Sequence, residues 1–111
     1  MESILTSIKK MLGIEADYTH FDTELIIFIN SVFGILHQLG VGPTDAPFKI
    51  DNASSTWDEF IVNDQIETVK SYMFMKVKLM FDPPQSSAVL SSYKELIQEF
   101  EWRCNVNAET P

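Results

Sequence analysis

The sequence predicts a small all-α fold, a helical bundle, and three observations support this prediction. Apolar residues recur at steps of three and four in three long segments, at about residues 23–39, 65–82 and 86–103. This spacing is that of one face of an α-helix. Glycine, proline and short polar residues separate the segments, and no stretch alternates apolar and polar residues as a half-buried strand does. A shorter apolar pattern at about residues 3–12 predicts a further, N-terminal helix.

The segment 65–82 is expected to be the central helix of the bundle. Apolar residues occupy most of its sides, as in a helix that is surrounded by others. Lysines interrupt the run, which is also shorter than the ~20 residues that a bilayer requires. Asp64 and Glu67 have the spacing of a capping box at its start. Pro83 and Pro84 end it, because proline lacks the N–H group that a helix needs.

Capping residues and glycines mark the limits of the first two helices. Ser3 and Asp22 are predicted N-caps. Gly13 and Gly40 suit the position just after a helix end. Gly34, inside the second helix, costs ~1 kcal/mol relative to alanine and therefore predicts a close approach of another helix. Five side chains are expected to be inaccessible in the core: Phe28, Val32, Val69, Met73 and Val77.

A long connection, residues 41–55, lies between the second and third helices. It contains two prolines, a glycine and short polar residues, and a connection of this length in a small domain is often functional or disordered. We expect it to be the least ordered internal segment and to contact a neighbour through Phe48 and Ile50. Thr56 and Glu59 then form a capping-box pattern before a helical turn with three inward-facing residues: Trp57, Phe60 and Ile61.

Composition and charge limit the class of protein. A chain of 111 residues is one domain, and we divide it into a helical domain at 1–103 and a flexible tail at 104–111. Sixteen acidic against eight basic residues give a formal charge of −8, which disfavours unselective binding to nucleic acid or to an anionic membrane. The single cysteine, Cys104, excludes an internal disulfide and favours a cytosolic protein. The N-terminus has the wrong order of charges for a secretory signal.

Candidate catalytic groups are isolated from one another in the sequence. His20 and His37 lie on different elements, with no partner at the spacing of metal ligands. Cys104 has no histidine nearby to activate it. The carboxylates do not follow the order of a calcium loop, and there is no glycine-rich phosphate loop. We therefore predict no enzymatic activity, no metal and no cofactor.

The two tryptophans are candidates for contact residues. Tryptophan and arginine are enriched at protein interfaces, although packing in the core is as consistent with each tryptophan. Trp57 follows the long connection, and Trp102 and Arg103 close the last helix. The sequence after them has too few apolar groups to fold alone. The predicted contacts with a partner protein or a neighbouring subunit are Phe48, Ile50, Trp57, Trp102, Arg103 and Val106.

The chain also resembles a known family along nearly its whole length. The segments in order are MLGI, FDTELI, INSV, QLGVGP, STWDEFI, VKSYMFMKVKLMFDPPQSSAV and EFEWRCNV, of which LMFDPP, SSAV and EFEWR are the most specific. They resemble the head–tail connector (adaptor) proteins of tailed phages and prophages of Gram-positive bacteria. Cys104 departs from the pattern, which has an aliphatic residue there.

The resemblance implies a structural protein of the virion neck. Proteins of that family are small helical subunits that form a ring beneath the portal after genome packaging and receive stopper or tail proteins. The implied partners are the portal, a stopper or tail completion protein and further copies of the chain. DNA would pass through the ring without specific binding, and no membrane is involved. The protein would be in the host cytoplasm during assembly and then at the head–tail interface.

Further expectations and two alternatives remain at this stage. The free subunit is expected to be monomeric or weakly associated and to form a ring on the portal, with helix 23–39 supplying one contact patch. One alternative is a small acidic regulatory protein that imitates DNA, which would need its carboxylates in one stripe. The other is an enzyme subunit whose site a partner completes.

Overall fold

The predicted all-α class is confirmed in a computed structural model that describes residues 2–43 and 48–109. Within these residues there is no β-strand, only an isolated bridge between Ser3 and Thr56. No helix of the described chain is long and apolar enough to cross a membrane. The helices in order are α1 (Ile4–Met11), α2 (Asp22–Gln38), α3 (Ile66–Phe81) and α4 (Ser87–Glu109), with short 3-10 turns at Trp57–Glu59 and Asn63–Gln65.

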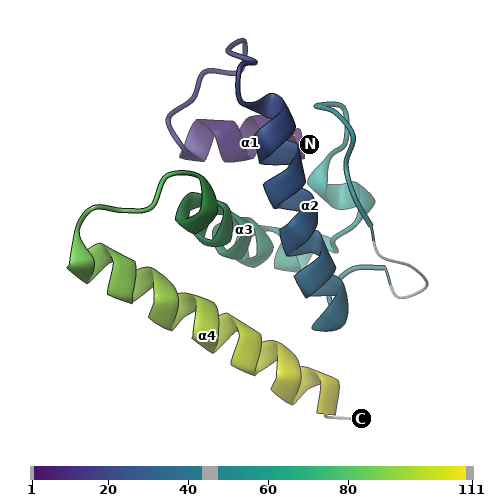
Figure 1. The fold of residues 1–111 in the computed structure, drawn as a ribbon. Helices are drawn as coiled ribbons and strands as arrows, with labels where there is room; N and C mark the ends of the chain where they lie inside the picture. The colour runs from purple at the N-terminus through teal and green to yellow at the C-terminus, as the bar shows by residue number, and fades with distance from the viewer. Residues whose placement is uncertain (1, 44–47, 110–111) are drawn as a thin grey trace.

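The helix α3 lies at the centre, as predicted. It contacts α1, α2 and α4, and Figure 1 shows α2 crossing one side of it while α4 runs along another. Of the predicted core residues, Val32, Val69, Met73 and Val77 are buried. Phe28 is an exception: it is only partly buried, because it lies on the flank of α2 beside the end of α3.

The local signals around α1 and at the end of α3 are confirmed. Ser3 Oγ accepts a hydrogen bond from the Thr6 N–H group at 3.2 Å. Gly13 follows the helix end with φ +82°, a conformation that glycine adopts without strain. The helix α3 ends before Pro83 and Pro84, as the double proline predicts.

The predicted caps at the starts of α2 and α3 are wrong. Phe21 occupies the N-cap position of α2, and no side chain caps it. Asp22 lies inside the helix, with its carboxylate 2.8 Å from the buried ammonium of Lys9. The helix α3 begins at Ile66, also without a side-chain cap. An ion pair with a residue of another helix has therefore replaced a local capping bond at Asp22.

The connection after α2 packs on the core over the part that the structure describes. Phe48 and Ile50 are buried, which corrects their prediction as surface contacts. The side chain of Asn30 holds the backbone of Ile50 by two hydrogen bonds, of 2.9 Å to its carbonyl and 2.8 Å from its N–H group. The ring of Phe48 contacts those of Phe33 and Phe60. Residues 44–47 of this predicted loop lie outside the described residues, and its contact with a neighbour stays a prediction.

The helical turn predicted after this connection is present at Trp57–Glu59, but its tryptophan is not a surface contact residue. The capping box of Thr56 and Glu59 is present. Trp57 is fully buried, and its indole N–H group donates to Ser7 Oγ at 2.8 Å. Trp57 is therefore a core residue that joins this turn to α1, so its prediction as a contact residue is corrected.

The last helix is longer than predicted. Ser86 Oγ accepts from the Val89 N–H group at 3.4 Å, which confirms a serine cap. The helix α4 then continues to Glu109 and does not end near Arg103. No glycine or proline lies between Ser87 and Glu109, so no residue there breaks the helix. The helix continues without a break across the predicted boundary between the helical domain and the tail, at residues 103 and 104. That residues 104–111 form a separate flexible tail stays a prediction.

Gly34 does not mark a close helix approach, since a Cβ atom placed there would meet nothing within 4 Å. We therefore expect Gly34→Ala to raise the free energy of unfolding by about 0.5–1 kcal/mol, because alanine has the higher helix propensity. Urea denaturation measures the change. The control is Gly40→Ala, which should destabilise because Gly40 has φ +83°. A destabilised Gly34→Ala variant would show that the space at this position is needed in the folded subunit.

Candidate assembly surfaces

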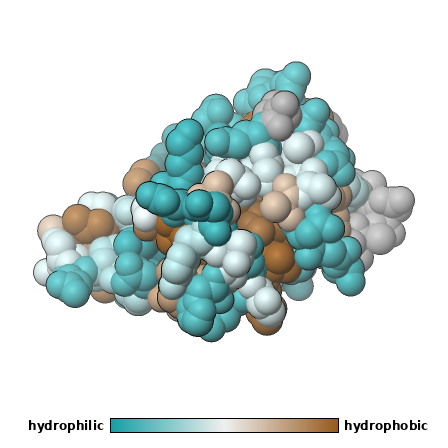
Figure 2. Space-filling view, turned by 90° about the horizontal axis from the view of Figure 1, so that it is seen from above, coloured by the Kyte–Doolittle hydropathy of each residue, from teal (hydrophilic) through white to brown (hydrophobic). Residues whose placement is uncertain are grey.

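Exposed apolar side chains lie at several separate places on the described surface. The most exposed are Trp102 (63%) on α4, Val62 (62%) before α3 and Ile27 (58%) on α2. Figure 2 shows apolar areas interrupting a largely hydrophilic surface, including the narrow end on the left where α4 begins. Among its described side chains, α4 buries Ile97 and exposes four large apolar residues: Val89, Leu96, Trp102 and Val106.

Contacts between α3 and α4 fix the rotation of α4 about its axis. The ring of Phe100 stacks on that of Tyr72, with 4.3 Å between centroids. The Tyr72 hydroxyl donates a hydrogen bond to Glu101 at 2.7 Å, and the Lys76 ammonium lies 3.9 Å from the same carboxylate. Residues 100 and 101 therefore face α3, which turns Trp102 toward solvent.

A groove lies beside the C-terminal half of α4. Its volume is about 320 Å³. The end of α2, the start of α3 and α4 form its walls, with Leu39, Val41, Val69, Phe100, Arg103 and Cys104 among the lining residues. Over the described part of the chain, no three His, Cys, Asp or Glu side chains gather as metal ligands would. Polar side chains, among them Asp64, Gln65 and Thr68, complete the lining of the groove.

Comparison with known protein families decides the identity of the chain. The family model described as phage connector protein matches residues 4–111. The chain belongs to this family. No curated protein and no solved structure matched it. The resemblance drawn from the sequence is thereby confirmed, and the connector is a structural component of a phage particle.

Three of the six predicted contact residues of the connector lie together on α4. Trp102 and Arg103 are exposed near its C-terminal end, and Val106 lies one turn further on. The Arg103 guanidinium pairs with Glu99 at 2.6 Å, as their spacing predicts. The other three, Phe48, Ile50 and Trp57, are in the core of the subunit. The surface of the connector available for assembly therefore includes the C-terminal half of α4 and excludes those three side chains.

An exposed aromatic cluster was missed by the sequence analysis. Tyr18, His20 and Phe21, from the loop before α2, contact one another, and Phe21 also contacts Phe81 at the end of α3. The only local signal was the run of three aromatic rings within four residues, in a loop with no helical pattern. Phe81 was not identifiable as their partner, because its contact depends on how α2 and α3 pack.

The environment of Tyr72 keeps its hydroxyl protonated. Burial, followed by the hydrogen bond to Glu101 and the charge of that carboxylate, raises the pKa of Tyr72 far above its ordinary 10.0. The folded connector therefore holds this proton more tightly than the unfolded chain. The resulting stability is complete below pH 10.0 and decreases as the pH rises above it.

Cys104 is expected to alkylate slowly. Burial, and secondarily the negative charge of Glu101, raises the pKa of the Cys104 thiol above its ordinary 9.0, so little thiolate forms near neutral pH. The rate of iodoacetamide labelling against pH should have its midpoint above 9.0. Glu101→Gln should lower that midpoint, and unfolding in guanidinium should restore the ordinary value. A midpoint below 9.0 in the folded connector would contradict this account.

Proposed function

We propose that this connector forms a ring in the phage neck, between the portal and the stopper or tail proteins, after the genome has been packaged. Membership of the phage connector family supports the structural role. We further propose that the protein has no catalytic activity of its own. The raised pKa of Cys104 supports this second proposal, because a thiol that stays protonated is a poor nucleophile.

The C-terminal half of α4 is the proposed portal contact. The observation that carries this assignment is the exposure of Trp102 on the side of α4 that faces away from α3. Arg103 is next to it and Val106 is one turn further on. Aromatic and arginine side chains are the usual anchors of protein interfaces. In Figure 1 this end of α4 extends beyond the end of α2, where a partner can reach it.

Contacts between neighbouring copies in the ring are proposed to involve α2. A ring requires heterologous contacts, in which one patch meets a different patch on the next copy. Ile27 supplies exposed apolar surface on α2, with Phe28 and Ile35 only partly buried beside the core. The net charge of −8 suits a ring through which DNA passes, because an acidic wall repels phosphate.

Capture of the connector by portal-bearing heads tests the proposal. Trp102→Ala, and separately a deletion of residues 105–111 that keeps the half-buried Cys104, should leave the subunit folded and abolish capture. The matched control is Val62→Ala, which removes an equally exposed apolar side chain outside α4 and should be captured normally. Negative-stain images of the heads would show a ring on the portal with the control and none with the two variants.

Two results would contradict the proposal. Normal capture of both α4 variants would place the portal contact on another surface. Sedimentation of the free connector as a tight symmetric dimer at micromolar concentration would argue against a subunit that forms a ring only on the portal. Normal capture of the variants would not contradict the proposed ring. A tight dimer in solution would not contradict the proposed contact between α4 and the portal.

A further inference from the structure

A cluster of aromatic rings is exposed at the end of the molecule where α2 begins and α3 ends. This aromatic cluster consists of Tyr18, His20, Phe21 and Phe81, with ring centroids 5.8 Å apart for Tyr18 and Phe21 and 5.1 Å apart for Phe21 and Phe81. Tyr18 is half exposed, and Met80 is exposed beside Phe81. Figure 1 places this end of the molecule far from the C-terminal end of α4.

A shallow hollow continues the aromatic cluster between α2 and α3. Its volume is about 400 Å³, and its lining residues are Phe21, Glu24, Phe28, Met80, Phe81 and Asp82. It combines aromatic and thioether surface with two carboxylates. This hollow is large enough for an aliphatic side chain of a partner, with acidic groups at its edge.

The loop that carries the aromatic cluster is held in place by a buried lysine. Lys9 is 2% exposed; its ammonium lies 2.8 Å from the Asp22 carboxylate and donates to the Ala16 carbonyl at 3.0 Å. These contacts tie the loop to both α1 and the start of α2. A surface that is already ordered loses little conformational entropy when a partner binds.

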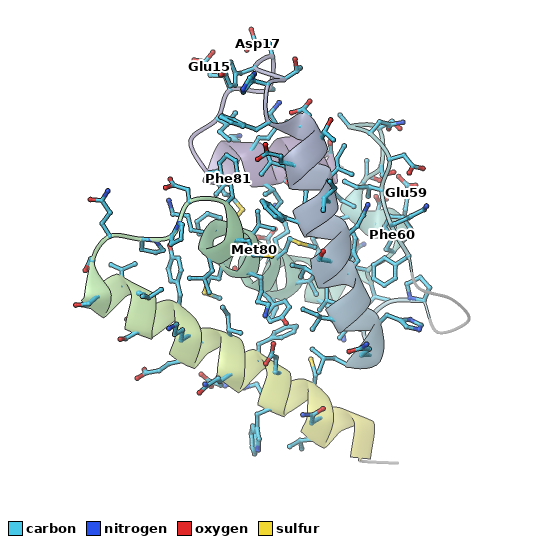
Figure 3. All side chains as sticks on the ribbon, in the orientation of Figure 1. Glu15, Asp17, Glu59, Phe60, Met80 and Phe81 are labelled. Carbon is cyan, nitrogen blue, oxygen red and sulfur yellow. The ribbon has the colours of Figure 1, made fainter. Side chains whose placement is uncertain are left out.

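Uncompensated negative charge surrounds the aromatic cluster. Figure 3 shows Glu15 and Asp17 at the tip of the loop before α2, and Glu24 lies in the first turn of that helix. Within the described residues, none of these three carboxylates has an ion-pair partner. Three nearby bases, Lys9, Lys10 and Lys78, are already paired with Asp22, Glu2 and Asp82.

We propose that this end of the connector binds a basic segment of a different protein, one that carries arginine or lysine together with an aliphatic anchor. The carboxylates of Glu15, Asp17 and Glu24 attract the cations, and the aromatic faces add cation–π contacts. The aliphatic anchor fills the hollow between α2 and α3. The same charges repel nucleic acid phosphate. The proposal concerns a different end of the molecule from the portal contact and does not depend on it.

The charges of the chain disfavour a second copy as the occupant. Most of its bases are already in ion pairs within the described subunit: Lys9, Lys10, Lys70, Lys76, Lys78 and Arg103. Lys49 and Lys94 remain, and they lie on separate elements, one in the connection after α2 and one on α4. A second copy therefore offers no cluster of cations to this acidic surface.

Titration of the ¹⁵N-labelled full chain with a synthetic arginine–leucine peptide tests the proposal. Chemical-shift changes are expected at residues 15–28 and 80–82, and they should weaken as salt is added. A glutamate–leucine peptide should not bind, and an arginine–serine peptide should bind at least tenfold more weakly because it lacks the anchor. Tyr18→Ala should also weaken binding of the arginine–leucine peptide.

Two triple variants with the same net charge make the test specific. Glu15→Gln, Asp17→Asn and Glu24→Gln together should reduce the affinity at least tenfold. Asp51→Asn, Asp64→Asn and Glu95→Gln together remove three exposed carboxylates elsewhere and should leave the affinity unchanged. Equal losses in the two variants, or shift changes centred on other residues, would overturn the proposal. Because the assay uses the free subunit and a peptide, its outcome is independent of capture by heads.

Discussion

Replacing Trp57 with alanine is expected to lower the free energy of unfolding by about 3–5 kcal/mol. Trp57 has no exposed surface, and its indole donates to Ser7 across the contact between α1 and the 3-10 turn. The substitution leaves a cavity in the core and removes the donor to a buried hydroxyl. A loss of this size is a large fraction of the total stability of ~5–15 kcal/mol that a domain has. Guanidinium denaturation followed by circular dichroism measures it.

The other tryptophan is the matched control for this experiment. Trp102 is 63% exposed, so Trp102→Ala should change the free energy of unfolding by less than ~0.5 kcal/mol. Replacing tryptophan with alanine is thus expected to destabilise the fold at position 57 and to affect only assembly at position 102. Similar losses of stability at the two positions would show that Trp102 also packs against the fold.

Replacing Lys9 with methionine is expected to lower the free energy of unfolding by about 3 kcal/mol, because it leaves the partner carboxylate without its counter-charge. The Lys9 ammonium is buried between Asp22 and the Ala16 carbonyl, and methionine supplies neither charge nor donor. The neighbouring Lys10 is 79% exposed, so Lys10→Met should change stability by less than ~0.5 kcal/mol. Thermal denaturation of the two variants compares them directly.

A double variant separates the ion pair from the packing of the lysine stem. Adding Asp22→Leu to Lys9→Met removes the unpaired carboxylate, so the double variant should lose less stability than the sum of the two single losses. If the losses of unfolding free energy in the two single variants add up to that of the double variant, then Lys9 and Asp22 do not stabilise the fold through their mutual ion pair. Equal effects of Lys9→Met and Lys10→Met would contradict the buried position of Lys9.

Local patterns predicted the elements of this fold well, because each depends on residues close in sequence. The cap at Ser3, the capping box of Thr56 and Glu59 and the stop at Pro83 all involve groups within four residues of one another. The period of the apolar residues also located α3 at the centre. These features follow from backbone geometry alone and need no knowledge of the packing.

The failures came from contacts between distant parts of the chain. Asp22 is a residue type that is favoured at helix N-caps, but a lysine on another helix binds its carboxylate. Ile50 lies in a sequence typical of a loop, but Asn30 fixes its backbone against α2. Neither partner is visible from the local sequence, since each is brought in by the tertiary fold. Such contacts turned predicted surface residues into core residues.

The candidate surfaces could be predicted only in part for the same reason. The sequence placed Trp57 in an inward-facing turn but also left both tryptophans as candidate contact residues. The hydrogen bond from Trp57 to a hydroxyl on α1 assigns Trp57 to the core. The resemblance to phage connectors indicated the role of the chain without indicating which of its faces are exposed. The aromatic cluster combines a loop before α2 with the end of α3, so its existence depends on a packing angle that no local pattern gives.

The contacts of α1 have a consequence for the order in which the nascent chain folds on the ribosome. The Ile4 N–H group donates to the Ser55 carbonyl at 3.0 Å, and Ser7 accepts from Trp57. The helix α1 is translated before these partners, which lie about 50 residues later in the chain. Until they have been translated, the apolar side of α1 has no complete binding site and is open to chaperones. Docking of α1 is therefore a late step, even though α1 is synthesised before these partners.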